Sequence, residues 1–154
     1  MTDLITGQAV AEVKLLYTSK VPQSEMKKIN SSRDACELLR TIPHLHENIE
    51  YKEYFYVMFL NRANKVKAVN LVSDGGISGT IVDPRIILQG AILTNSSAII
   101  LMHNHPSGST QPSEADRKLT DKIKEAAKYH EISVLDHLIV TSESYLSFAD
   151  EGLM

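Results

Sequence analysis

Cysteine is nearly absent from the sequence, which excludes two ways of stabilising a small domain. Cys36 is the only thiol among the 154 residues, so neither an intramolecular disulfide nor a cysteine-rich metal site can form. So little cysteine suits a reducing compartment. The amino terminus carries Asp3 and Gln8 and has no basic stretch followed by an apolar run, so it does not resemble a signal peptide. We therefore expect a cytoplasmic protein.

Long apolar runs and an excess of basic charge are lacking as well. Apolar runs such as residues 98–102 have the length of a strand and fall far short of the ~18–20 residues of a membrane helix. The formal net charge of −3 does not provide the basic surface typical of a dedicated nucleic-acid binder, although it leaves room for a small basic patch. We expect no membrane association.

The remaining composition is that of an ordinary globular protein, with 43% hydrophobic and 23% charged residues and the length of about one domain. Residues 1–30 are expected to form a strand at 11–18 and a linker at 21–30. The domain itself is expected to occupy residues 31–154.

The hydrophobic pattern predicts strands that alternate with helices. A helix begins at Ser31 or Ser32 and is stopped by Pro43, and a polar connection follows at 44–50. The pair Asp83-Pro84 opens a second helix, and residues 113–129 form a third. Ile86, Ile87, Gly90, Ala91 and Leu93 are the positions expected to be buried in the second helix. Strands are predicted at 54–60, 66–72, 98–102, 134–141 and 145–148. We expect an α/β fold, with a mixed β-sheet and helices packed on its faces.

His103 and His105 follow the apolar strand at 98–102, and Asp116 lies in the first turn of the helix after them. Residues i and i+2 of an extended chain point to the same face, so both imidazoles can converge on one point. The helix N-terminus partly offsets the charge of the carboxylate. Two nitrogens and one oxygen leave a fourth tetrahedral position for water, which is the layout of a catalytic zinc site. We predict that these three residues bind one divalent metal, zinc.

Simpler interpretations exist for the same residues. Paired strand histidines often only form hydrogen bonds, and Ser113-x-x-Asp116 matches a capping box that would by itself explain both residues. His44 and His46 form a second H-x-H pair, which we interpret as surface residues of a polar loop. His137 is expected in a strand, where it makes a buried hydrogen bond or stands behind the metal ligands or in a substrate groove.

The string His103-Asn104-His105-Pro106-Ser107-Gly108, followed by Pro112-Ser113-Glu114-Ala115-Asp116, resembles the JAMM motif of MPN/JAB-domain metalloproteins. In that motif H-x-H precedes seven residues, a serine, two residues and an aspartate, and the spacing here is the same. Matches at residues 61–64, 76–80, 83–85 and 135–138 resemble the bacterial RadC family, long labelled as DNA repair proteins. The resemblance covers about residues 31–154 and implies a cytidine-deaminase-like, MPN-type JAB fold.

The resemblance also implies two catalytic roles. JAMM proteins use an upstream glutamate on another strand as general base, and the segment 52–55 selects Glu53, with Glu50 as a nearby alternative. The motif serine, here Ser113, helps to stabilise the oxyanion of the tetrahedral intermediate. The implied function is a zinc-dependent peptidase or isopeptidase acting on a protein or peptide. Ser78 and Thr80 are implied to line its substrate groove.

Full-length RadC proteins carry an amino-terminal helix-hairpin-helix region, which residues 1–30 are too short and too strand-like to provide. We therefore expect a short form without that region and no direct contact with DNA. Two other functions stay open. One is a non-catalytic, metal-stabilised accessory module associated with DNA repair or processing complexes. The other is a metal-dependent nuclease, which would call for a second metal site about 3.5–4 Å from the first.

Overall fold

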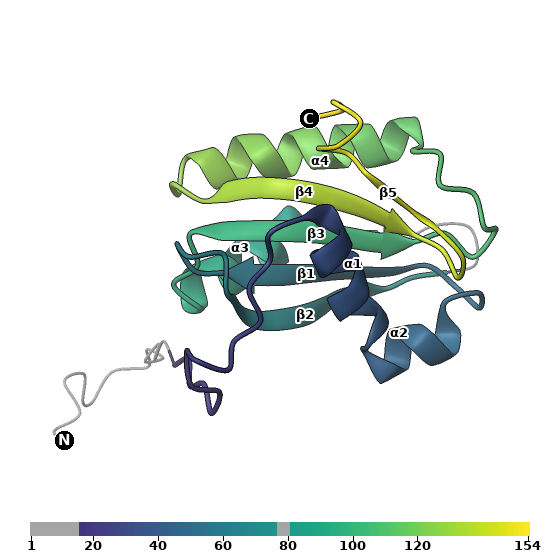
Figure 1. The fold of residues 1–154 in the computed structure, drawn as a ribbon. Coiled ribbons are helices and arrows are strands. Elements are labelled where there is room, and N and C mark those ends of the chain that lie inside the picture. Colours follow the sequence, from purple (N-terminus) through teal and green to yellow (C-terminus); the bar gives the residue numbers. More distant parts are fainter. Residues whose placement is uncertain (1–15, 77–80) are drawn as a thin grey trace, which may run out of the picture.

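A mixed five-stranded β-sheet forms the centre of the protein, whose computed structural model describes residues 16–76 and 81–154 (Figure 1). The helices are α1 (Ser32–Arg40), α2 (Pro43–Asn48), α3 (Pro84–Leu93) and α4 (Glu114–Lys128). The strands are β1 (Tyr54–Leu60), β2 (Val66–Asp74), β3 (Ala98–Asn104), β4 (Ser133–Val140) and β5 (Tyr145–Ser147). The predicted α/β class and mixed sheet are confirmed.

In the strand order β2-β1-β3-β4-β5, the three central strands β1, β3 and β4 each have one terminus at the same end of the sheet. β3 and β4 are parallel, so their carboxyl ends lie side by side. β1 is antiparallel to β3, and Phe55 near its start is paired with His103 near the end of β3. The start of β1 and the carboxyl ends of β3 and β4 therefore lie together at one end of the sheet.

Each face of the sheet is covered by its own pair of helices, because successive side chains of a strand point to opposite faces. In β1, Tyr54, Tyr56 and Met58 belong to a core shared with α1 and α2. The alternate residues Phe55, Val57 and Phe59 belong to a core shared with α3 and α4. Every residue of β1 and of β3 is consequently buried, as the apolar runs at 54–60 and 98–102 predict.

The polar connection predicted at residues 44–50 is wrong, because the structure has a helix, α2, over most of it. Pro43 ends the preceding helical segment and also serves as the first residue of the next helix, where its missing N–H costs no hydrogen bond. Leu45 is completely buried and anchors α2 to the sheet. Because the residues around Leu45 are charged or polar, the sequence of this segment shows no helical pattern of apolar residues.

Other predictions differ from the structure at their margins. Ile86 and Leu93 of α3 are 43% and 39% exposed, whereas Ile87 and Ala91 are fully buried, so the buried side of α3 is narrower than predicted. The strand expected at 11–18 is not formed at residues 16–18, and its other residues lie outside the described ranges, as do Ser78 and Thr80. β2 continues to Asp74 because its pairing with β1 extends that far. No helix in the described ranges has the length and apolar character needed to cross a lipid bilayer.

Gly90 marks a close approach of α3 to β1, and Gly90→Ala is expected to destabilise the protein. An added Cβ would lie 2.6 Å from Cζ of Phe59, whose ring is 2% exposed and has little room to move. Overpacking costs about 1–3 kcal/mol, and the better helix propensity of alanine returns up to ~1 kcal/mol, so we expect a net loss of about 1–2 kcal/mol. Urea unfolding measures it, with the exposed Gln89→Ala in the same helix as control. A Gly90→Ala protein as stable as wild type would contradict this packing.

Candidate metal centre

His103 and His105 converge at the end of β3, as the period of an extended chain predicts. Their Nε2 atoms lie 3.0 Å apart. His103 is 1% exposed and stacks against the ring of Phe55, with 6.0 Å between ring centroids and 7° between planes. His105 lies just beyond the strand and is partly exposed. His103 therefore forms the buried side of the site, and His105 lies on its solvent-exposed side.

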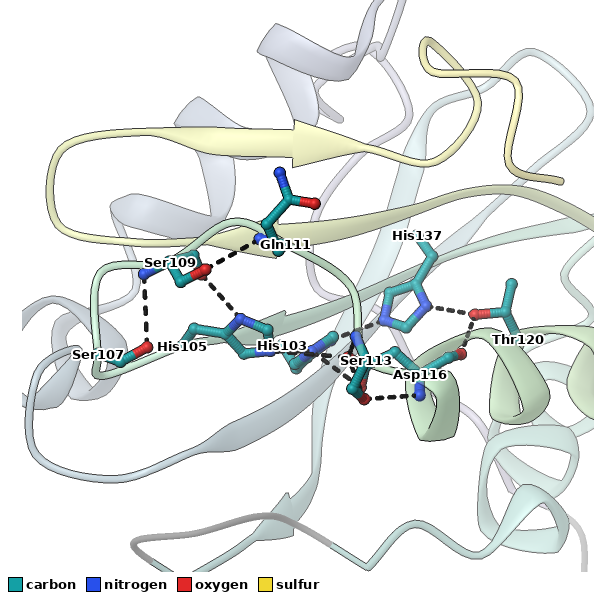
Figure 2. A network of polar contacts seen from close by, with 9 residues as sticks. All are labelled: His103, His105, Ser107, Ser109, Gln111, Ser113, Asp116, Thr120 and His137. Atoms are coloured by element: carbon teal, nitrogen blue, oxygen red, sulfur yellow. Dashed lines mark hydrogen bonds and ion pairs between the residues drawn. The ribbon is translucent and has the colours of Figure 1, made fainter.

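Asp116 uses its two carboxylate oxygens for two different purposes (Figure 2). Ser113 is the N-cap of α4, and Oδ2 of Asp116 accepts hydrogen bonds from the backbone N–H and the hydroxyl of Ser113, both at 2.7 Å. Oδ1 faces Nε2 of His103 at 3.2 Å. The capping box expected from the sequence is present, and it holds the carboxylate against the histidines, so the two interpretations of Ser113-x-x-Asp116 are compatible.

The spacing of these atoms fits a tetrahedral metal ion. Nε2 of His103, Nε2 of His105 and the oxygens of Asp116 are separated by 3.0, 3.2 and 3.7 Å. Ligands bound tetrahedrally to zinc at ~2.0–2.1 Å lie about 3.3 Å from one another. Within the described ranges, this is the one group of three or more histidine, cysteine or acidic residues whose ligand atoms come close enough to hold an ion.

The loop after β3 determines which nitrogen of His105 faces this site. Nδ1 of His105 lies 2.8 Å from the backbone carbonyl oxygen of Ser109. A carbonyl only accepts, so Nδ1 carries the hydrogen and the lone pair of the neutral ring is on Nε2. Gly108 allows the required turn, with a φ of 81° and its N–H donating to the carbonyl of His105. The loop thus presents His105 in the form that binds a cation.

The carboxyl of Asp116 is held in its ionised form. Burial raises its pKa, but the neighbouring His103 and the hydrogen bonds from Ser113 outweigh burial and leave the pKa below its usual range. The donor set is therefore two imidazole nitrogens and one anionic oxygen.

Glu53 lies immediately before β1, at the same end of the sheet as His103 and His105. Its carboxyl is half-buried, and burial raises its pKa. The nearby His103 and His105 lower the pKa, and Asp116 raises it, which places Glu53 within electrostatic reach of all three residues. The alternative, Glu50, is exposed.

Asn104, the residue between the two histidines, holds the Glu53 segment in place. Its side chain is completely buried. Oδ1 accepts from the backbone N–H of Tyr54 at 2.8 Å, and Nδ2 donates to the carbonyls of Lys52 and Ile49 at 2.9 and 2.7 Å. The amide thus binds the backbone on both sides of Glu53, a role that sequence reasoning missed because the partners are about fifty positions away.

Three of the other four histidines differ in their burial. His137 is completely buried behind His103, as its position in a strand suggests, and makes hydrogen bonds there. Burial lowers its pKa well below the ordinary value. His44 and His46 are exposed as predicted, although they lie in α2, and Nδ1 of His44 contacts the hydroxyl of Tyr56 at 2.8 Å.

Comparison with known proteins identifies the chain's relatives. The RadC-like JAB domain family matches residues 29–153. A UPF0758 protein of Flavobacterium johnsoniae is 44% identical over 155 residues, which cover 96% of this chain and 64% of that protein. UPF0758 proteins of Porphyromonas gingivalis and Pelodictyon phaeoclathratiforme are each 39% identical, over 88% and 83% of this chain and 60% and 56% of their own lengths.

The chain thus spans about 56–64% of the length of these relatives, and their names state no activity. The match nevertheless includes the strand end, the loop and the helix start that carry His103, His105 and Asp116. The chain belongs to the RadC-like JAB domain family.

Proposed function

We propose that the protein is a zinc-dependent metallohydrolase of the peptidase or isopeptidase class. The observation that carries this proposal is the convergence of three ligand atoms, from His103, His105 and Asp116, within 4.8 Å of one another. A half-buried glutamate with a raised pKa stands beside them. Perturbed ionisable groups gathered in this way are typical of active sites.

A zinc ion at this donor set would supply Lewis acidity, which activates a water molecule and polarises a substrate carbonyl. Glu53 takes the proton from the attacking water and delivers it to the leaving nitrogen. Its raised pKa suits both transfers, because a base with a pKa closer to neutrality can also return the proton. Asn104 keeps the backbone around Glu53 fixed while the carboxyl gains and loses the proton.

Ser113 stabilises the substrate oxyanion in this proposal. In the structure its hydroxyl donates to Oδ2 of Asp116 at 2.7 Å. The hydroxyl hydrogen has to turn toward the substrate to act, while the backbone N–H of Ser113 keeps its bond to the same carboxylate oxygen. The cap therefore survives the rotation.

Glu53→Gln is the test of this function. The amide cannot accept the water proton, so we expect hydrolysis to fall by at least ~100-fold, the usual contribution of general base catalysis. The zinc-loaded protein is screened against peptide and isopeptide libraries, and products are detected by mass spectrometry. Zinc content is measured on the same samples.

Glu50→Gln is the matched control, since Glu50 is an exposed carboxylate close in sequence, and it should cleave as wild type does. Cleavage that survives Glu53→Gln would refute the assigned base. The absence of any cleavage by zinc-loaded wild type would instead favour a second candidate, a non-catalytic accessory module that the metal stabilises. The capping role of Ser113 supports this second candidate, because it gives the motif serine a structural function.

A further inference from the structure

A chain of hydrogen bonds runs from α4 through β4 to the metal ligand on β3 (Figure 2). The hydroxyl of Thr120 contacts the backbone carbonyl of Asp116 at 2.7 Å and Nδ1 of His137 at 2.6 Å. Nε2 of His137 lies 2.8 Å from Nδ1 of His103. Both inner members are buried, His137 completely and Thr120 to 1% exposure. The chain links two ligand residues through two residues that do not themselves face the metal position.

The hydrogens of this chain can be assigned from its α4 end. The carbonyl oxygen of Asp116 only accepts, so the single hydrogen of the Thr120 hydroxyl points to it. The hydroxyl oxygen is then left to accept from His137. Nδ1 of His137 must therefore carry a hydrogen.

The remaining assignments follow from burial. An imidazolium with no access to water is costly, so His137 is neutral and its Nε2 has no hydrogen. This nitrogen accepts from Nδ1 of His103, which consequently carries the hydrogen of that contact. In a neutral His103 the lone pair is then on Nε2, the atom that faces His105 and Asp116.

We propose that Thr120 and His137 are positioning residues that fix the tautomer and the ring orientation of His103 for metal binding. This inference rests on the proposed metal site and adds to it the two residues that prepare it. Packing supports the role, because the ring of Phe148 lies 4.7 Å from that of His137, centroid to centroid, and Phe55 covers His103. The rings are thus held by contacts on their faces as well as at their nitrogens.

The chain also ties the two ligands to each other. Thr120 bonds to the carbonyl of Asp116, and the carboxylate of the same residue faces His103. A shift of α4 along the sheet would break the contact between Thr120 and His137 and move Asp116 at the same time. The first turn of α4 and the end of β3 are therefore fixed relative to each other before a metal arrives.

The decisive experiment compares Thr120→Val with Thr120→Ser. Valine has the shape of threonine but no hydroxyl, whereas serine retains the hydroxyl. Competition with a chromophoric chelator gives the zinc affinity of each protein. We expect Thr120→Val to bind zinc about 10–100-fold more weakly, the usual effect of losing a partner behind a metal ligand, and Thr120→Ser to stay within about 3-fold of wild type.

Nitrogen-15 NMR of the imidazoles tests the hydrogen-bond chain directly, in wild type and in Thr120→Val. In wild type, with and without zinc, we expect His137 to be neutral with its hydrogen on Nδ1, and in Thr120→Val we expect part of it to move to Nε2. A wild-type His137 protonated on Nε2, or equal zinc affinity of the two variants, would overturn the inference. If wild type binds no zinc, the proposed function fails, and the position of the His137 hydrogen still decides whether the chain exists.

Discussion

His103→Ala is expected to abolish zinc binding together with the stabilisation that zinc provides. Only two of the three proposed ligand residues remain in this variant. The buried imidazole that contacts both His105 and Asp116 is lost. Zinc at 1,000 times its dissociation constant stabilises a folded protein by about 4 kcal/mol. For a chain of this length that corresponds to a rise in melting temperature of about 8–16 °C. Wild type should show this rise, and His103→Ala should show none.

The measurements are zinc content after purification without chelators and calorimetry with added zinc or EDTA. His46→Ala is the matched control, because His46 belongs to the exposed H-x-H pair. It should keep one zinc per chain and the full rise in melting temperature. Wild type that purifies without zinc and gains no stability from it would rule out the metal site.

Asn104→Ala is expected to cost about 3 kcal/mol of unfolding free energy. The variant loses three hydrogen bonds and leaves the N–H of the buried Tyr54 without its acceptor. Leaving one buried backbone group unsatisfied costs about 1–3 kcal/mol, and the two carbonyls add to this. Because single domains are stable by only about 5–15 kcal/mol, the loss is a large part of the total. Urea unfolding measures the change.

Asn70→Ala provides the comparison, since Asn70 is an exposed asparagine on β2, and we expect its effect to stay within about 0.5 kcal/mol. Hydrogen exchange adds a local readout. The amide of Tyr54 should exchange faster in Asn104→Ala, because its acceptor is gone, while the amides in the middle of β1 stay protected. Unchanged protection at Tyr54 would show that Asn104 does not hold the segment around Glu53.

The elements of the fold were predictable wherever the chain alone dictates them. The apolar runs of β1 and β3 and the Asp83-Pro84 start of α3 form as their sequences indicate. α2 was missed because its attachment depends on one residue, Leu45, and on the surface that the sheet offers it. Local sequence patterns predict a helix or strand well when its own residues show the expected periodicity or cap. They predict it poorly when its stability comes from packing against another element.

The site shows the same division. The placement of His137 behind His103 depends on the parallel register of β3 and β4, which pairs Leu101 with His137. The placement of Glu53 depends on the antiparallel register of β1 and β3. No local pattern encodes either register, so Glu53 was reached through the family resemblance, and the hydrogen-bond chain through His137 was not foreseen.

Two repeated patterns show what the sequence determined and what the tertiary structure decided. Ser-x-x-Asp forms a complete capping box at Ser31–Asp34 and again at Ser113–Asp116, because the cap is a local arrangement of four residues. H-x-H occurs at 44–46 and 103–105, but residues two apart diverge on a helix and share a face in a strand. The sequence determined the caps and the strand. Only the packing of α4 against β3 and β4 brings the cap at Ser113–Asp116 next to the histidine pair at 103–105. Contacts between such distant segments depend on sheet register and helix packing, which no local pattern contains.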